Sequence, residues 1–121
     1  MSDNLLVYLV DDDQAVLDSL TGLLSAAQRE MRQFLSAESF LRTLDESSAC
    51  CVVTDLKMTG MSGQDLLHTL KAGDYLLPII VVTGHATVPV TVELMYSGAV
   101  TLLEKPYKPA ELLKAVDQAL K

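Results

Sequence analysis

Asp11 and Asp12 stand directly after the apolar run 5–10, and Asp55 directly after a second apolar run, 50–54. Carboxylates held within a few ångströms of one another repel, and a divalent cation relieves that repulsion. Oxygen ligands without His or Cys suit Mg²⁺ or Mn²⁺, and Mg²⁺ commonly keeps waters and an open position for a phosphate oxygen. If the two runs lie side by side, these three aspartates predict a magnesium site.

Two more residues that could do chemistry follow later apolar runs. Thr83 ends the run 79–83, and Lys105 comes soon after the run 100–103. With the aspartates they supply a cation site, a carboxylate nucleophile, a hydroxyl and an ammonium. Phosphoryl transfer needs such groups, because the protein mainly positions them and stabilises charge on the phosphoryl oxygens. We therefore expect phosphorylation of a carboxylate.

Each residue also has a simpler interpretation when it is taken alone. Asp13 suits the cap of a helix, and Asp11 and Asp12 fit a solvated acidic turn. Thr83 is an ordinary β-branched strand residue, and Lys105 could be a solvated lysine. What favours a site is that all of them are expected at one edge of the same sheet.

The elements that must position these residues alternate along the chain. Short apolar runs predict buried strands, and apolar residues at helical spacing predict helices. Strands are predicted at 5–10, 50–54, 79–83 and 100–103, and a further one at 31–35, where the pattern is weaker. Helices are predicted after Asp13, over 37–44, 64–72 and 88–97, and from Pro109 onward. This order predicts an α/β fold, (βα) five times, with a doubly wound parallel sheet whose ligands bind at the carboxyl ends of the strands.

Composition limits the partners. The 121 residues, half of them hydrophobic, fit one domain over 1–121. The formal net charge of −7 argues against direct contact with nucleic acid, which requires clustered Lys and Arg. No run approaches the ~20 apolar residues that cross a bilayer, and the first residues do not resemble a signal peptide. We expect a cytoplasmic protein without membrane contact.

Four motifs, in this order along the chain, resemble the receiver domain of bacterial response regulators. They are Val10-Asp11-Asp12-Asp13, Thr54-Asp55-Leu56-Lys57-Met58 with Met61-Ser62-Gly63, Val82-Thr83-Gly84-His85, and Glu104-Lys105-Pro106-Tyr107. The residues at 83–93 and 98–100 are most similar to FixJ-type transcription regulators, which carry a helix-turn-helix output domain. The resemblance covers essentially the whole chain and implies a flavodoxin-like sheet with strand order 2-1-3-4-5.

The resemblance also assigns roles to individual residues. Asp55 would accept a phosphoryl group from a phosphohistidine on a sensor histidine kinase. Asp12 and Asp55 would bind Mg²⁺ directly, together with the backbone carbonyl of Lys57, and Asp11 would act through water. Such a domain is not an enzyme in the usual sense, because it catalyses only its own phosphorylation and dephosphorylation.

Other roles concern the phosphoryl group once it is attached. Thr83 would donate a hydrogen bond to one phosphoryl oxygen, Lys105 would pair with another, and Gly84 would leave room beside them. The family usually has a cis peptide bond at the position of Lys105–Pro106. His85 is either a loop residue that tunes solvent access or a base.

Phosphorylation in this family changes the face formed by helix 88–97, strand 100–103 and the last helix. That face would control an output domain or a partner protein, and a phosphorylation-dependent homodimer is a further partner. No output domain is expected in this chain. Met95, Tyr96, Leu102 and Tyr107 either pack in the core or contribute to such a surface.

Two residues depart from the family pattern. Thr59 stands where a proline usually follows the acceptor, which predicts a less rigid loop with altered kinetics at most. Leu102 stands where an aromatic residue usually swings inward when Thr83 engages phosphate. The aromatic half of that switch is therefore missing.

Three other functions remain open at this point. The first is a haloacid-dehalogenase-like phosphatase, since 11–13 is a D-x-D, although Ala15 replaces the expected Thr or Val and no segment is available for a substrate cap. The second is a flavodoxin-like nucleotide binder, which three aspartates after the first strand would disfavour. The third is a receiver that only binds other proteins.

Overall fold

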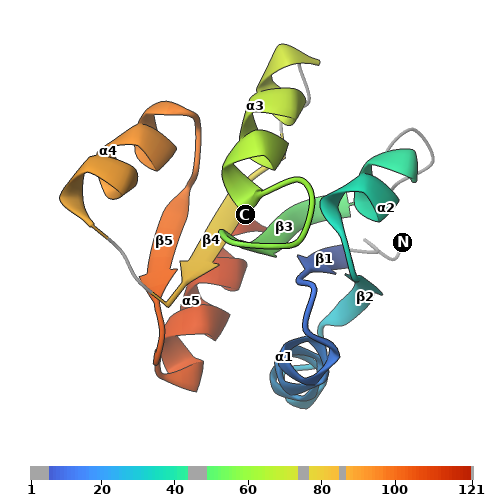
Figure 1. Ribbon diagram of the computed structural model, residues 1–121. Helices are drawn as coiled ribbons and strands as arrows, with labels where there is room; N and C mark the ends of the chain where they lie inside the picture. The colour runs from blue at the N-terminus through green and yellow to red at the C-terminus, as the bar shows by residue number, and fades with distance from the viewer. Residues whose placement is uncertain (1–5, 44–48, 74–76, 85–86, 121) are drawn as a thin grey trace.

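The computed structural model describes residues 6–43, 49–73, 77–84 and 87–120. Strands and helices alternate throughout (Figure 1). They are β1 (Leu6–Val10), α1 (Gln14–Ala26), β2 (Glu30–Phe34), α2 (Ala37–Arg42), β3 (Ala49–Asp55), α3 (Gly63–Ala72), β4 (Ile79–Thr83), α4 (Val88–Tyr96), β5 (Thr101–Glu104) and α5 (Pro109–Ala119). Among the described helices, none has the length and apolar composition needed to span a membrane.

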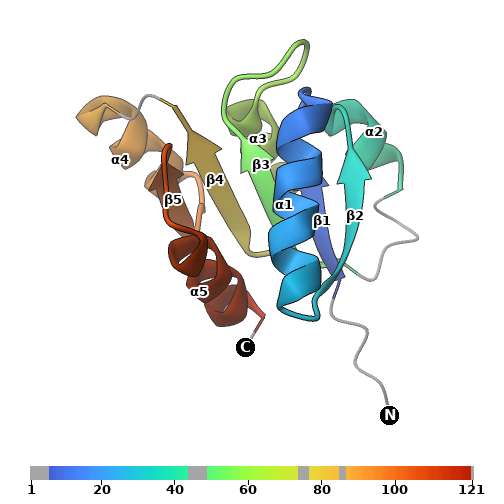
Figure 2. The same ribbon diagram turned by 90° about the horizontal axis from the view of Figure 1, so that it is seen from below.

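The five strands form one parallel sheet in the order β2-β1-β3-β4-β5, which confirms the predicted fold. Helices α1 and α5 cover one face, while α2, α3 and α4 cover the other (Figures 1 and 2). Strand order reverses at β1, so β1 lies between β2 and β3. Residues that follow β1 and β3 therefore meet at the carboxyl edge of the sheet, where ligands bind in such folds.

Each face of the sheet has its own apolar core. On the side of α1 and α5, aliphatic side chains such as Leu17, Leu24 and Leu112 are fully buried. On the other side, the rings of Tyr8, Phe34 and Phe40 meet with centroids 5.4 to 5.6 Å apart. Burial of these side chains on both faces stabilises the sheet whose edge carries the candidate site.

The edge strand β2 is more exposed than the neighbouring strand β1. Glu30, Arg32 and Gln33 are exposed, and Phe34 is buried. The guanidinium of Arg32 lies 5.8 Å from the centre of the Tyr8 ring and 5.5 Å from that of Phe34. The charged side chain thus covers the outer border of the aromatic core by stacking on its rings.

The ends of most described elements agree with the predicted ranges to within one residue. The strand predicted at 100–103 occupies Thr101–Glu104, because the ladder with β4 continues through Glu104 after the apolar residues end. The helix predicted over 37–44 ends at Arg42, and Thr43 caps it by donating its backbone N–H to the carbonyl of Phe40 at 3.0 Å.

Candidate functional site

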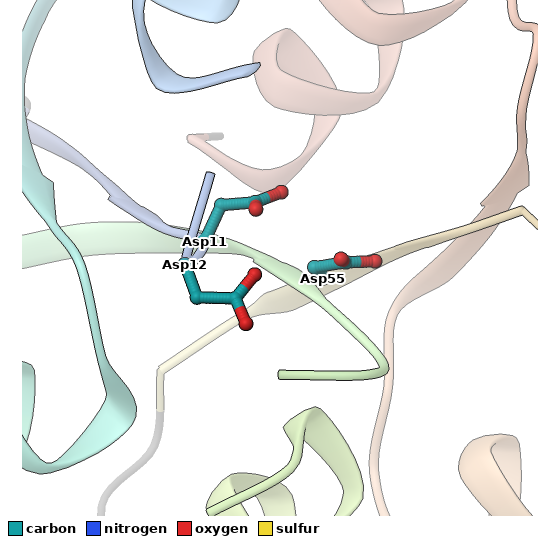
Figure 3. A group of neighbouring side chains, drawn as sticks. All are labelled: Asp11, Asp12 and Asp55. Atoms are coloured by element: carbon teal, nitrogen blue, oxygen red, sulfur yellow. The ribbon is translucent and has the colours of Figure 1, made fainter. Parts of the chain in front are cut away.

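Three carboxylates converge where β1 and β3 end. Asp11 and Asp12 follow β1, Asp55 is the last residue of β3, and each offers an oxygen within 4.8 Å of the oxygens of the other two (Figure 3). The pairing of Val10 with Thr54 sets this register, since it brings the next residues of both strands level. The predicted meeting of these three aspartates is confirmed.

Asp11 is held by backbone contacts on both sides. Its N–H donates to the carbonyl of Phe34 at 3.1 Å, and its Oδ1 accepts from the N–H of Asp13 at 2.9 Å. Burial raises the pKa of Asp11; the hydrogen bond from Asp13 opposes that shift, and the negative charge of Asp55 adds to it. Asp13 caps α1 by accepting from the N–H of Ala15 at 2.9 Å, so its simpler interpretation is correct.

Asp12 is exposed, and it contacts the loop that follows β3. Its Oδ2 accepts two hydrogen bonds from Thr59, one from the backbone N–H at 2.8 Å and one from the hydroxyl at 3.0 Å. These two bonds lower the pKa of Asp12. Asp12 therefore remains a carboxylate to lower pH than an ordinary aspartate, and it does not cap a helix.

Asp55 is half-buried beside the strand β4. The N–H of Leu56 is shared between Oδ1 of Asp55, at 2.9 Å, and the carbonyl of Val82, at 3.1 Å. Burial raises the pKa of Asp55, while the positive charge of Lys105 and the bond from Leu56 lower it. The carboxylate is thus partly desolvated and keeps a cation beside it, which is an environment suited to a nucleophile.

Lys105 follows β5, and its side chain reaches Asp55 past the end of β4, which lies between β3 and β5. Its Nζ lies 3.8 Å from Oδ1 of Asp55, and its backbone N–H donates to the carbonyl of Thr83 at 2.7 Å. Thr83 is buried at the end of β4, and the peptide bond between Lys105 and Pro106 is cis, as the resemblance implied. Backbone pairing thus holds the threonine and the lysine next to each other.

The remaining predicted residues lie around this centre. Lys57 is exposed in the loop after β3, and Gly84 is exposed with open space where a Cβ would stand. Leu102 is half-buried and packs against the core on the side of α4. His85 lies outside the described residues, so the prediction for it stays a prediction.

Gly63 was not predicted as a site residue, although it determines how closely α3 approaches Asp55. A Cβ at this position would lie 2.4 Å from the carbonyl oxygen of Asp55, and the N–H of Gly63 donates to the carbonyl of Leu56 at 2.8 Å. Ser62 and Asp65 form a capping box that fixes the start of α3. The pattern S-x-x-D at 62–65 was the available signal.

The donor set fits a divalent cation. Asp11 and Asp55 both have raised pKa values because burial disfavours their charged forms, and negative charges nearby add to this for each of them. A cation between the three carboxylates would relieve that unfavourable charge, and all three contribute oxygen, the ligand that Mg²⁺ prefers. Asp11, Asp12 and Asp55 are the residues that would hold it.

Comparison with known proteins decides the family. The family model described as the response regulator receiver domain matches residues 7–117. The chain belongs to the response-regulator receiver family. Receiver domains are signalling modules of two-component systems, which settles the choice between the receiver and the phosphatase or nucleotide-binding interpretations in favour of the receiver.

Similar receivers occur in transcriptional regulators. The chain is 41% identical over 115 residues to the transcriptional regulatory protein FixJ of Bradyrhizobium diazoefficiens, covering 95% of this chain and 56% of that protein. It is 38% identical over 122 residues to the response regulator protein TodT of Pseudomonas putida, covering 100% of this chain and 54% of that protein. The chain thus spans slightly more than half the length of these relatives.

Solved structures agree with this receiver assignment. The crystal structure of FixJ-N matches with a TM-score of 0.90 at 37% identity, covering 99% of this chain and 95% of that one. Full-length FixJ from B. japonicum matches with a TM-score of 0.89 at 41% identity, covering 95% of this chain and 57% of that one. The similarity to FixJ-type receivers is therefore confirmed in both sequence and fold.

Proposed function

We propose that this receiver domain accepts a phosphoryl group on Asp55 from a phosphohistidine of a sensor histidine kinase. The observation that carries the proposal is the convergence of Asp11, Asp12 and Asp55 within 4.8 Å, with the ammonium of Lys105 3.8 Å from the acceptor. A receiver without phosphoryl chemistry would have no need to keep this combination of charges together.

In the proposed reaction, a carboxylate oxygen of Asp55 attacks phosphorus and forms an O–P bond while the P–N bond to the imidazole breaks. The electrons of that bond stay on the leaving nitrogen, which then takes a proton. Asp12, Asp55 and the backbone carbonyl of Lys57 would hold Mg²⁺ directly and Asp11 would hold it through water, and the cation would neutralise charge on the phosphoryl oxygens.

The other residues act on the product of this reaction. Lys105, now paired with Asp55 at 3.8 Å, would transfer its ion pair to a phosphoryl oxygen. The hydroxyl of Thr83 would donate to a second oxygen, and Gly84 would leave space for the group. Phosphorylation then stabilises the conformation in which these contacts are best, and this shifts an existing equilibrium.

The surface of α4 is the proposed site where that shift is detected. Five large hydrophobic side chains are 45% to 84% exposed on α4 and just after it: Val88, Val92, Met95, Tyr96 and Val100. Exposed apolar groups of this kind mark interaction surfaces. We assign this surface to an output domain, a partner protein or a second phosphorylated copy, and Leu102 to the packing beneath it.

The biological output is proposed to be transcriptional. FixJ is named a transcriptional regulatory protein, and this chain matches slightly more than half of it. The formal net charge of −7 does not favour direct DNA contact by this domain. DNA binding would therefore belong to another part of the whole protein or to a partner.

The central test is the replacement Asp55→Asn. Wild-type protein with Mg²⁺ and acetyl phosphate should gain one acid-labile phosphoryl group, detected by intact mass, and Asp55→Asn should gain none because an amide is a poor nucleophile. Asp117→Asn, an exposed aspartate on α5, is the matched control and should be labelled like wild type. Normal labelling of Asp55→Asn would refute the assignment.

Two further outcomes distinguish the alternatives. Multiple turnover of a phosphomonoester would contradict the proposal that this receiver modifies only itself. Addition of beryllofluoride and Mg²⁺ should change the amide NMR spectrum around Thr83 and α4. An unchanged spectrum would identify a receiver that only binds other proteins.

A further inference from the structure

Thr59 makes a contact that the usual proline of this family could not make. Both its backbone N–H and its hydroxyl donate to the same oxygen of Asp12, Oδ2, at 2.8 and 3.0 Å. Proline has neither donor. The contact joins residues 47 positions apart, so it links the end of β1 directly to the loop after β3.

The same loop is held at a second point. Oε2 of Glu38, on α2, accepts from the N–H of Met61 at 3.3 Å, and Gly60 between the two contacts has φ +81°. Residues 59–61 are therefore attached to two acidic side chains from different elements. The sequence had predicted a less rigid loop because proline is missing, whereas these hydrogen bonds supply a restraint of another kind.

The two bonds leave the carboxylate of Asp12 with one oxygen for other partners. Oδ2 already accepts two hydrogen bonds, which is its capacity in the plane of the carboxylate. In Figure 3 one oxygen of Asp12 points toward Asp11 and Asp55, and the other points away from them. Hydrogen bonds to a carboxylate that binds a metal hold it in the orientation needed for binding.

We propose that Thr59 is a positioning residue that orients Asp12 for Mg²⁺ by occupying one carboxylate oxygen with two hydrogen bonds. This inference rests on the proposed function, since it concerns the same metal site. According to this proposal, Thr59 belongs to the metal site of this chain. The earlier prediction treated it only as a replacement for proline that has little effect.

The test measures Mg²⁺ binding by isothermal titration calorimetry, without any phosphoryl donor. Thr59→Val removes the hydroxyl and keeps the N–H, so Mg²⁺ affinity should fall about fivefold. Thr59→Pro removes both donors, and affinity should fall by at least about tenfold. Thr59→Ser keeps both donors and should bind like wild type.

The matched control is Thr69→Val. Thr69 is also exposed, and its hydroxyl donates to the carbonyl of Asp65 within α3 at 2.9 Å, so this variant should leave Mg²⁺ affinity unchanged. Thermal melting of every variant in EDTA reports any general loss of fold. A positioning role predicts that Thr59→Val loses affinity while its melting temperature stays close to that of Thr69→Val.

Phosphorylation rates provide a second measurement. With acetyl phosphate, Thr59→Val should need about fivefold more Mg²⁺ for half-maximal rate but reach nearly the wild-type rate at saturation, because the acceptor itself is intact. Unchanged or tighter Mg²⁺ binding by Thr59→Val would overturn the inference, since it would mean that Thr59 is neutral or competes with the metal.

Asp12→Asn separates this inference from the proposed function. If Asp12→Asn weakens Mg²⁺ binding and Thr59→Val does not, the metal site stands and the role of Thr59 is wrong. If wild type binds no Mg²⁺, or Asp12→Asn binds it as well as wild type, the proposed metal site itself is wrong, and the inference fails with it.

Discussion

The acceptor region, named after the proposed role of Asp55 and formed by β1, β3 and the start of α3, is packed much more tightly than the edge formed by α4 and β5. Residues 7–10 of β1 are all buried, and α3 buries Gly63, Leu66, Leu67 and Leu70. By contrast, α4 buries Leu94 alone, and no residue of β5 is fully buried. Within the described residues, the proposed phosphorylation site is therefore the more firmly held part.

Helix α4 is joined to the rest of the protein by buried Leu94, by partly buried Val90 and by two polar contacts with α3. Gln64 donates to Glu93, and Nε2 of His68 lies 3.0 Å from Oγ of Ser97, so two exposed pairs join α3 to α4. Such contacts contribute little and exchange readily with water. Segments with few buried apolar contacts open at low free energy, whereas catalytic groups need rigid support. The proposed chemistry and its proposed readout by α4 thus place opposite mechanical requirements on the two regions.

The largest predicted effect comes from deleting a core ring that packs against Tyr8 of β1. Phe40→Ala removes a fully buried side chain that contacts Tyr8 and Phe34, and it should lower the free energy of unfolding by about 3 to 5 kcal/mol. Val92→Ala on the exposed side of α4 should change it by less than about 0.5 kcal/mol. Urea denaturation measures both, and equal losses would remove the proposed contrast.

An intermediate effect is expected at Gly63. Gly63→Ala places a Cβ 2.4 Å from the carbonyl oxygen of Asp55, so the backbone must move, at a cost of about 1 to 3 kcal/mol. Labelling by acetyl phosphate should also slow, because the acceptor strand and α3 separate. If Gly63→Ala shows both the loss of stability and the slower labelling, the close packing of α3 against β3 supports the proposed chemistry as well as the fold.

The matched control for Gly63→Ala is Gly22→Ala. Gly22 lies inside α1, and an added Cβ there would meet nothing within 4 Å. Alanine is the better helix former, so this variant should be more stable by about 0.5 to 1 kcal/mol. A destabilised Gly22→Ala would show that the loss at Gly63 is not specific to the contact with Asp55.

The smallest predicted effect concerns charge. The folded-state pKa of Asp11 is raised, mainly by burial, so metal-free protein binds that proton more tightly than the unfolded chain does. The stability that protonated Asp11 contributes is present at pH values below the unfolded pKa of about 4. This stability is lost as the pH rises through the folded-state pKa of Asp11. Near neutral pH, Asp11→Asn should raise the melting temperature by about a few degrees.

Asp12→Asn is the variant to compare with Asp11→Asn, because the pKa of Asp12 is shifted in the opposite direction. Because the bonds from Thr59 lower the pKa of Asp12, its contribution is present above the unfolded pKa and is lost as pH falls through the folded pKa. Asp12→Asn should therefore not be stabilised in EDTA near neutral pH. Calorimetry of both variants in EDTA tests this, and a similar rise in both would contradict the structural difference between the two aspartates.

Much of the acceptor region was predictable from sequence, because one pattern repeats. Each apolar run stops at a polar residue, and parallel strands place those stops at one edge. The meeting of Asp11, Asp12 and Asp55 follows once β1 lies beside β3. The position of the carboxylate cluster could therefore be predicted from residue types and spacing, whereas the roles of its individual residues came from the resemblance to receivers and stay predictions.

The supporting contacts were not predictable in the same way. Thr59 meets Asp12 across 47 positions, and Met61 meets Glu38 across 23, so neither contact follows from a local period. Gly63 looked like an ordinary loop residue, because its close approach to Asp55 depends on how α3 packs. Residues that hold a site in place depend on contacts between elements, which sequence spacing does not encode.

The two edge strands of the sheet have a consequence for solubility. A parallel sheet ending at β2 and β5 has two edge strands, where another chain could add a strand and start aggregation. On β2, exposed Glu30, Arg32 and Gln33 oppose such addition, and Arg32 does so while covering aromatic rings. Arg32, which borders the aromatic core, therefore also opposes the addition of strands from other chains to this edge of the sheet.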